Sequence, residues 1–204
     1  MSDNRKTSLI LTMEPDRLGE FFPLLQQGVV VETQVGCTLD KILSQQWDIP
    51  PEYAAERITT IFLNSRPIDS LATTLIREDA VIALSGAMPG LVGATMRRGG
   101  YYAAMREGIT HHDTTGDVTG RVAAVRVKLF NLLLAELGPG FLQRGINISA
   151  SELSGFIKGR NDSFWQGCRS ALLDNYPLLP PSLLREDRFP AGSTVRMSVN
   201  FPNP

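Results

Sequence analysis

The residues that could do chemistry gather in one glycine-rich stretch, residues 86–100, and in the aromatic pair that follows it. Glycines let backbone N–H groups approach an anion, and arginines add positive charge, so this stretch could form an anion-binding nest. A G-x-x-G pattern alone is unspecific, so a plain crossover between two modules is the competing interpretation. The candidate ligand- or partner-binding residues are Gly90, Gly93, Arg97, Arg98, Gly99, Gly100, Tyr101 and Tyr102.

The two histidines of the chain form the one metal-like cluster, His111-His112-Asp113 with Asp117 nearby. Neighbouring residues of an extended chain point to opposite sides, so such a run rarely supplies three ligands. A solvated linker is the preferred interpretation. Ser–His or Cys–His catalysis would have to recruit this loop, and the sequence has no G-x-S-x-G elbow. We therefore predict no catalytic residue, no metal ligand and no cofactor.

Two lone cysteines and two acidic pairs complete the reactive side chains. Cys37 precedes an expected helix N-terminus, whose dipole could lower the pKa of the thiol, but apolar neighbours favour a packed thiol. Cys168 has no C-x-x-C partner either, and unpaired thiols suit a reducing cytoplasm. The acidic pairs Glu78-Asp79 and Glu186-Asp187 lie in expected turns, where carboxylates are usually solvated.

Bulk properties exclude several classes of partner. The 204 residues carry a net charge of -1, which gives no electrostatic reason to bind nucleic acid or an anionic membrane. No apolar run approaches the roughly 18 residues of a membrane helix, and the first residues do not resemble a secretory signal. The expected location is cytoplasmic.

Alternating and helical apolar patterns predict an α+β fold in the first half of the chain. Strands are expected at residues 9–13, 29–35, 59–63 and 80–84. Between them, Thr38 can cap a helix whose apolar face carries Leu39, Ile42, Leu43 and Trp47. A short helix is expected at 52–57, a turn at 64–67, a loop beginning at Gly86 and a short helix at 101–106.

The second half opens and closes with alternating strands, at residues 125–129 and 195–201. Ser149 and Glu152 form a capping box for a helix with Leu153, Phe156 and Ile157 on one face. Asp162 is expected to cap a further helix, with Trp165, Cys168 and Leu172 aligned, that ends at Tyr176-Pro177.

An internal echo organises the chain into two modules. Residues 24–31, LLQQGVVV, are echoed by residues 141–148, FLQRGINI, and residues 76–79, IRED, by residues 184–187, LRED. Such self-similarity indicates related units. We predict a β-grasp-like N-terminal module at 1–107 with a Gly-rich tail segment, a linker at 108–117 and a second α+β module at 118–204. The second module could be a divergent repeat of the first.

The order strand, strand, helix, strand and final strand over residues 8–84 resembles a β-grasp, or ubiquitin-like, module. Within that fold it is similar to the sulfur-carrier branch, which includes the small subunit of molybdopterin synthase and the thiamine-pathway sulfur carrier. The motifs that carry the likeness are GCTL at 36–39, IFLN at 61–64, REDAVIAL at 77–84 and RGG at 98–100. In that family the Gly-Gly ends the chain and its carboxylate becomes a thiocarboxylate. Here Tyr101 follows Gly100.

These observations predict a non-catalytic cytoplasmic binding or accessory protein of β-grasp type, whose partner is another protein. Assembly into a homo-oligomer is an alternative that the sequence leaves open. The alternatives are a sulfur or acyl carrier matured by cleavage after Gly100, and a protein that binds a phosphorylated ligand in the Gly90–Gly100 loop. The apolar side chains around this loop are expected to be buried between the modules, because water disfavours such a patch. They are Met88, Leu91, Val92, Met96, Tyr101, Tyr102 and Met105.

Overall fold

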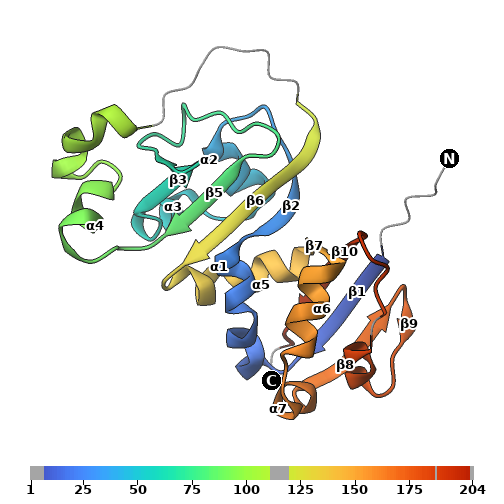
Figure 1. Cartoon of the computed structure of the whole chain (residues 1–204). Coiled ribbons are helices and arrows are strands. Elements are labelled where there is room, and N and C mark those ends of the chain that lie inside the picture. The colour runs from blue at the N-terminus through green and yellow to red at the C-terminus, as the bar shows by residue number, and fades with distance from the viewer. Residues whose placement is uncertain (1–6, 111–119, 187, 203–204) are drawn as a thin grey trace. The chain divides into compact units, whose positions relative to one another are not determined.

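The computed structural model describes residues 7–110, 120–186 and 188–202, and these residues form a mixed α+β fold, as predicted. The chain divides into two compact units (Figure 1). We call residues 24–137 the central unit, and residues 1–23 together with 138–204 the terminal unit. The division falls within α1 (Phe22–Gln27) and α5 (Leu133–Arg144). It differs from the expected division at 108–117, a segment that lies mostly outside the described residues.

The central unit is a five-stranded mixed sheet with short helices. Its strands lie in the order β4-β3-β5-β6-β2. The strands are β2 (Val29–Gln34), β3 (Thr60–Leu63), β4 (Arg66–Pro67), β5 (Val81–Ser85) and β6 (Val122–Phe130). The helical elements are α2 (Leu39–Lys41), the π-helical turn η2 (Ile42–Gln46), α3 (Pro51–Glu56), α4 (Gly90–Met96) and the 3-10 segment η3 (Tyr101–Ile109).

The helices α2 and α3 cover one face of this sheet (Figure 1). The predicted apolar helix face is confirmed: Leu39, Ile42, Leu43 and Trp47 are all buried. The strand residues that face the helices alternate with outward ones and are also buried, among them Ile61, Ile82 and Val127. Burial of each such side chain contributes roughly 1.5–3 kcal/mol, so this face is the core that holds the unit together.

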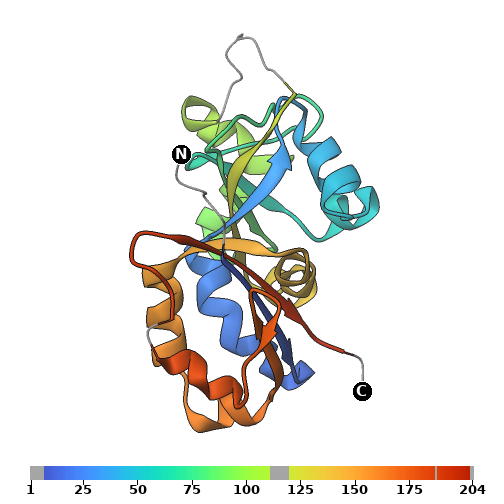
Figure 2. The same ribbon diagram turned by 90° about the vertical axis from the view of Figure 1, so that its right-hand side faces the viewer.

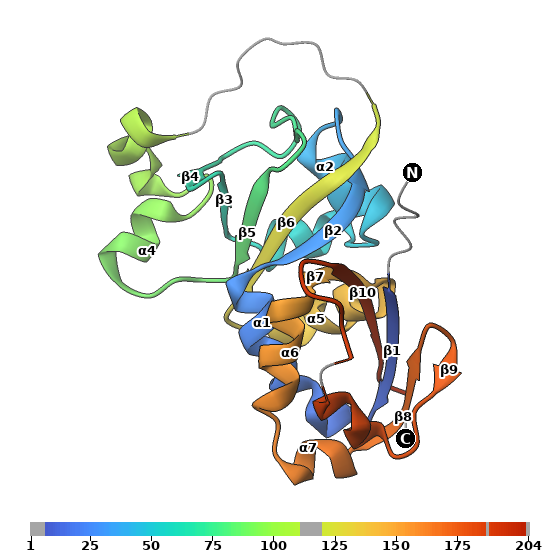
Figure 3. The ribbon, with the colours of Figure 1, turned by 45° about the vertical axis from the view of Figure 1, so that its right-hand side comes forward.

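The terminal unit is a second five-stranded mixed sheet, in the order β7-β10-β1-β8-β9 (Figures 2 and 3). Its strands are β1 (Thr7–Met13), β7 (Ile146–Ser149), β8 (Cys168–Leu173), β9 (Tyr176–Pro177) and β10 (Thr194–Asn200). Its helical elements are η1 (Pro15–Phe21), α6 (Ala150–Lys158), α7 (Asp162–Gln166) and η4 (Pro181–Arg185). The predicted capping box at the start of α6 is confirmed by reciprocal bonds between Ser149 and Glu152.

The two sheets share one sequence of pairing senses from edge to edge. In the central unit β4–β3 and β3–β5 are antiparallel, β5–β6 is parallel and β6–β2 is antiparallel. In the terminal unit β9–β8 and β8–β1 are antiparallel, β1–β10 is parallel and β10–β7 is antiparallel. The N-terminal strand β1 therefore occupies in the terminal unit the place that β5 occupies in the central unit.

This pairing corrects the expected make-up of the first module. The sequence order placed the strand at residues 9–13 in the same module as β2, β3 and β5. In the structure β1 pairs with β8 and β10, and the strand beside β2 is β6. Composition and periodicity indicate which face of a strand is buried, but not which other strand it pairs with. They therefore give no information about pairing between strands so far apart along the chain.

The predicted long helix from Asp162 to Tyr176 is wrong in its second half. The helix α7 ends at Gln166, its N-cap is Asn161, and residues 168–173 form β8. β8 contains a bulge: Thr12 and Met13 of β1 pair with Ser170 and Cys168, so Arg169 is an extra residue. The buried residues of β8, Cys168 and Ala171, are therefore three positions apart and lack the regular alternation that indicates a strand.

Candidate functional site

The glycine-rich stretch begins as a loop at residues 86–89, as expected, and then forms the helix α4, which was not expected. With η3, which matches the expected short helix, α4 forms a helical segment of the central unit. The helix α4 occupies residues 90–96 and packs against η3. We call residues 90–110 the α4–η3 segment; Figure 1 shows it beyond the β3 side of the sheet. Parallel strands such as β5 and β6 require a long crossover, and this segment lies within that crossover.

A buried arginine holds the α4–η3 segment together. Arg106 is 3 % exposed, and its guanidinium donates to both carboxylate oxygens of Asp69, at 2.6 and 3.1 Å. Its Nε donates to the carbonyl oxygen of Thr95 at 2.7 Å, and its Nη1 to the Thr110 hydroxyl at 3.0 Å. A buried guanidinium is tolerated when its donors are satisfied in this way. Arg106 therefore ties α4, η3 and the chain after β4 into one structure.

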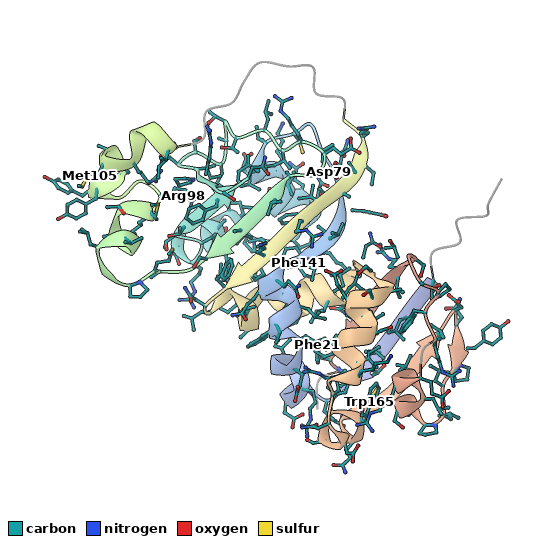
Figure 4. The ribbon with its side chains drawn as sticks, viewed as in Figure 1. Phe21, Asp79, Arg98, Met105, Phe141 and Trp165 are labelled. Atoms are coloured by element: carbon teal, nitrogen blue, oxygen red, sulfur yellow. The ribbon has the colours of Figure 1, made fainter. Side chains whose placement is uncertain are left out.

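A second arginine fastens the segment to α3 and to the residue that precedes β3. The backbone N–H of Arg98 donates to the carbonyl oxygen of Thr59 at 2.8 Å, and its Nη2 donates to that of Ala54 at 2.9 Å. Burial lowers the pKa of the Arg98 guanidinium, an effect that the Asp69 carboxylate opposes. Figure 4 shows Arg98 on the side of the segment that is turned toward the sheet, and Met105 at its outer side.

All eight candidate residues line one cavity of 510 Å³ in the central unit. The other lining residues are Thr59, Ala87, Met88 and Ala94. The glycines admit close backbone approach there: a Cβ built on Gly93 would overlap the carbonyl oxygen of Met88. The structure thus brings together the residues that the sequence singled out, and whether they bind a ligand stays a prediction.

Among the described residues, no carboxylate forms an ion pair with Arg97 or Arg98, so the cavity carries positive charge. The Arg97 side chain has no hydrogen-bond or ion-pair partner among the described residues. Arg98 donates to a carbonyl oxygen and forms no ion pair there, while Asp69 is occupied by Arg106. The buried Thr59 hydroxyl oxygen also lacks a partner. Two guanidinium groups and a hydroxyl around one cavity can bind a phosphate or carboxylate group.

Most large apolar side chains of the α4–η3 segment are exposed. The expected burial is therefore wrong for five of its seven residues, whereas Met88 and Met96 are half-buried. Of the ten large apolar side chains that the described part of the chain exposes, six lie in this segment. Tyr101 is 92 % exposed and Met105 71 % exposed. We call these six residues the apolar surface: Leu91, Val92, Tyr101, Tyr102, Met105 and Ile109. The anchors Arg98 and Arg106 already hold the segment in place, and they leave this surface in water.

We predict that Gly93→Ala destabilises the protein, because the new methyl group would overlap backbone atoms of Met88 that cannot rotate away. Overpacking of this kind costs about 1–3 kcal/mol. The matched control is Gly155→Ala in α6, where a Cβ meets nothing within 4 Å. That change should stabilise by about 0.5–1 kcal/mol through helix propensity. Thermal unfolding of both variants checks this; a Gly93→Ala variant as stable as the wild type would contradict it.

The remaining reactive groups do not converge on a site within residues 7–110, 120–186 and 188–202. Burial raises the pKa of the Cys37 thiol, so the considered activation by a helix dipole is not supported. Glu78 forms an ion pair with Arg121, and Asp79 lies in the turn before β5 with a positive φ. His111, His112, Asp113 and Asp117 lie outside the described residues. Among the described residues, no group of three metal-ligand side chains is present.

The buried thiol of Cys168 should be almost inert. Burial raises the pKa of this thiol to about 11, from an ordinary value of 9.0. At pH 8 the thiolate fraction is then about 100-fold lower than for an ordinary thiol, and it should rise about tenfold per pH unit below that pKa. Labelling with a chromogenic disulfide at pH 8 and pH 9 measures this. Reaction of Cys168 at the rate of free cysteine would contradict the burial.

A second cavity, of 530 Å³, lies on the face of the central sheet opposite α2 and α3, and sequence reasoning missed it. The strand β5 places the small side chains of Ala83 and Ser85 on this face, between Phe62 of β3 and Phe130 of β6. The only sequence feature that indicated this cavity is the presence of the small residues Ala83 and Ser85 in β5, a strand that is otherwise apolar.

In the described part of the chain, no helix is both long and apolar enough to cross a membrane. No protein-family model, curated protein sequence or solved structure matches this chain. The arrangement of its own residues is therefore what bears on function.

Proposed function

We propose that this chain is a non-catalytic binding protein, built of two β-grasp-like modules, that binds a partner protein through the apolar surface of the α4–η3 segment. The observation that carries the proposal is the exposure of six large apolar side chains on a segment that two arginines anchor. Soluble proteins rarely expose such patches without a binding role. Tyrosine and methionine are also enriched at interfaces.

The arrangement of the central unit supports the β-grasp part of the proposal. A helical segment between β2 and β3 packs across a mixed five-stranded sheet, which is the feature expected of such a module. The motif-bearing stretches occupy matching places: residues 36–39 enter α2, residues 61–64 end β3 and residues 77–84 lead through β5.

Two equivalent glycines support the proposal that the modules are related. Gly28 and Gly145 each separate a helix from a strand, with φ of 112° and 93°. The guanidinium of Arg126 donates to the Gly28 carbonyl oxygen at 2.8 Å, and that of Arg196 to the Arg144 carbonyl oxygen at 2.8 Å. The same helix–Gly–strand corner, bridged by an arginine from the neighbouring strand, thus occurs in both units.

The first test is partner capture by the full chain in its own host. Wild type should co-purify with a stoichiometric partner, and Leu91→Lys with Met105→Lys should lose it, because two charges would enter an apolar interface. The matched control is Tyr176→Lys with Leu179→Lys, which are 76 % and 79 % exposed in the terminal unit. Equal capture by both double variants would refute the proposed surface. A second copy of the chain as partner is recognised by its mass.

A second candidate function is binding of a phosphorylated ligand in the cavity of Arg97 and Arg98. The observation that favours it is that neither arginine forms an ion pair with a carboxylate in the part of the chain that the structure describes. With inorganic phosphate as probe, the thermal midpoint of wild type should rise, and Arg97→Ala should abolish the rise. Lys41→Ala removes an exposed cation that does not line the cavity, and should leave the rise intact. Absence of any rise with wild type would end this candidate.

The structure adds no support for a carrier matured at Gly100. The N–H of Gly99 donates to Asp69 at 3.3 Å and that of Gly100 to the Arg97 carbonyl oxygen at 3.2 Å, so both glycines lie within the folded segment. Cleavage there would have to open it. The intact mass of protein from its host, with only full-length chain expected, tests this alternative.

A further inference from the structure

We infer that the open face of the central sheet holds a binding site for a small amphipathic carboxylate, with the apolar body along β5 and the carboxylate on Lys128. This site is independent of the proposed partner surface. We call the 530 Å³ cavity there the β5 trough. Its lining residues are Phe62, Ser65, Val81, Ala83, Ser85, Met88, Pro89, Lys128, Phe130 and Asn131.

Strand register explains why a trough forms there. Ala83 lies opposite Phe62 on one side and opposite Lys128 on the other. One step along β5 on the same face, Ser85 lies opposite Phe130. Two small side chains in the middle strand, flanked by long ones in the neighbouring strands, leave an elongated hollow parallel to β5. Met88 and Pro89, which follow β5, line it further.

The size and lining of the trough suit a small organic ligand better than a hydrated ion. Ligand sites usually measure about 300–1,000 Å³ and are mainly apolar, with a few polar groups that orient the ligand. In the trough Phe62, Val81 and Phe130 supply apolar contact. The polar residues of the lining are Ser65, Ser85, Asn131 and Lys128. The Ser85 hydroxyl accepts a hydrogen bond from the Asn131 amide at 3.0 Å.

The charge of the ligand follows from Lys128, the one ionisable residue of the lining. No carboxylate among the described residues pairs with it. The base of its stem lies close to Gly28, where an added Cβ would lie 2.9 Å from the Lys128 Cγ, and its side chain lines the trough. One cation beside an apolar hollow matches a single carboxylate, whereas a phosphate dianion matches the two arginines of the other cavity.

Decanoate and its neutral analogue decan-1-ol are suitable probes for the full chain, below the micelle concentration, with NMR as readout. Decanoate should shift the amide signals of Ala83, Ser85 and Lys128 in a saturable way. Lys128→Met, which keeps the length of the stem, should weaken decanoate binding by at least about tenfold and leave decan-1-ol binding unchanged. The control Lys41→Met should change neither.

Filling the trough tests its position. Ala83→Leu should abolish binding of both probes, and Ala83→Val, which suits a strand, should weaken both if the leucine variant does not fold. The inference fails if wild type binds neither probe saturably, if the shifts map to the α4–η3 segment, or if Lys128→Met leaves decanoate affinity unchanged.

Discussion

Replacing Asp69 with alanine should loosen the α4–η3 segment while the rest of the central unit stays folded. The Arg106 side chain is 2 % exposed, and among the described residues its carboxylate partner is Asp69. Removal of one partner from a buried pair costs about 3–5 kcal/mol, and we expect about 3 kcal/mol because Asp69 itself is 40 % exposed. Amide hydrogen exchange at Arg98, Ala103 and Thr110 should then accelerate about 100-fold. The N–H groups of Ala103 and Thr110 donate within this segment, and that of Arg98 donates to the carbonyl oxygen of Thr59, just before β3.

The control for this change is Glu78→Ala, which removes the carboxylate of an exposed ion pair with Arg121 in the same unit. Exposed pairs contribute about 0–1 kcal/mol, so exchange in the α4–η3 segment should stay near the wild-type rate. Equal acceleration in both variants would mean that the buried pair does not hold the segment. Unchanged exchange in Asp69→Ala would mean the same.

Phe21→Ala should destabilise the terminal unit by about 3–5 kcal/mol. The Phe21 side chain is 0 % exposed, and its ring centroid lies 5.4 Å from that of Phe156, 5.8 Å from Phe164 and 6.0 Å from Phe201. Figure 4 shows Phe21 within this unit. Truncation would leave a cavity among three rings, which the surrounding elements cannot all move to fill.

The two tryptophans allow this effect to be assigned to one unit. Trp165 belongs to the terminal unit and Trp47 to the central unit. In urea, Phe21→Ala should lower the midpoint of the Trp165 transition, measured in a Trp47→Phe background. Tyr176→Ala, a change at an exposed aromatic of the same unit, should change the free energy of unfolding of this transition by no more than about 0.5 kcal/mol. A small effect of Phe21→Ala would contradict the central place of this ring.

The local elements of the fold could be predicted because their signals are local. Alternation found β2, β6 and β10, and helical spacing found the buried face of Leu39 and Ile42. The capping box of Ser149 is a four-residue pattern with its own hydrogen bonds. The misread β8 shows the limit of this reasoning, since a strand with a bulge lacks the regular alternation that would identify it.

The pairing of β1 with strands of the terminal unit and the exposure of the α4–η3 segment could not be predicted in the same way. The place of β1 beside β10 depends on pairing across more than a hundred residues. The exposure of Met105 depends on Arg106, whose burial an amino-acid sequence does not reveal because arginine is usually exposed. The candidate cavity was found because glycines and arginines lie close together along the chain.

Site-specific photo-crosslinking tests the proposed partner surface most directly. A benzophenone amino acid is placed at Met105 or, as control, at Tyr176, and the full chain is irradiated in its host cell. Both positions are more than 70 % exposed, but only Met105 belongs to the apolar surface. We predict one discrete protein adduct from Met105, absent at Tyr176 and lost when Leu91→Lys is added. No adduct at Met105, or the same adducts from both positions, would contradict the proposal that this surface binds a partner.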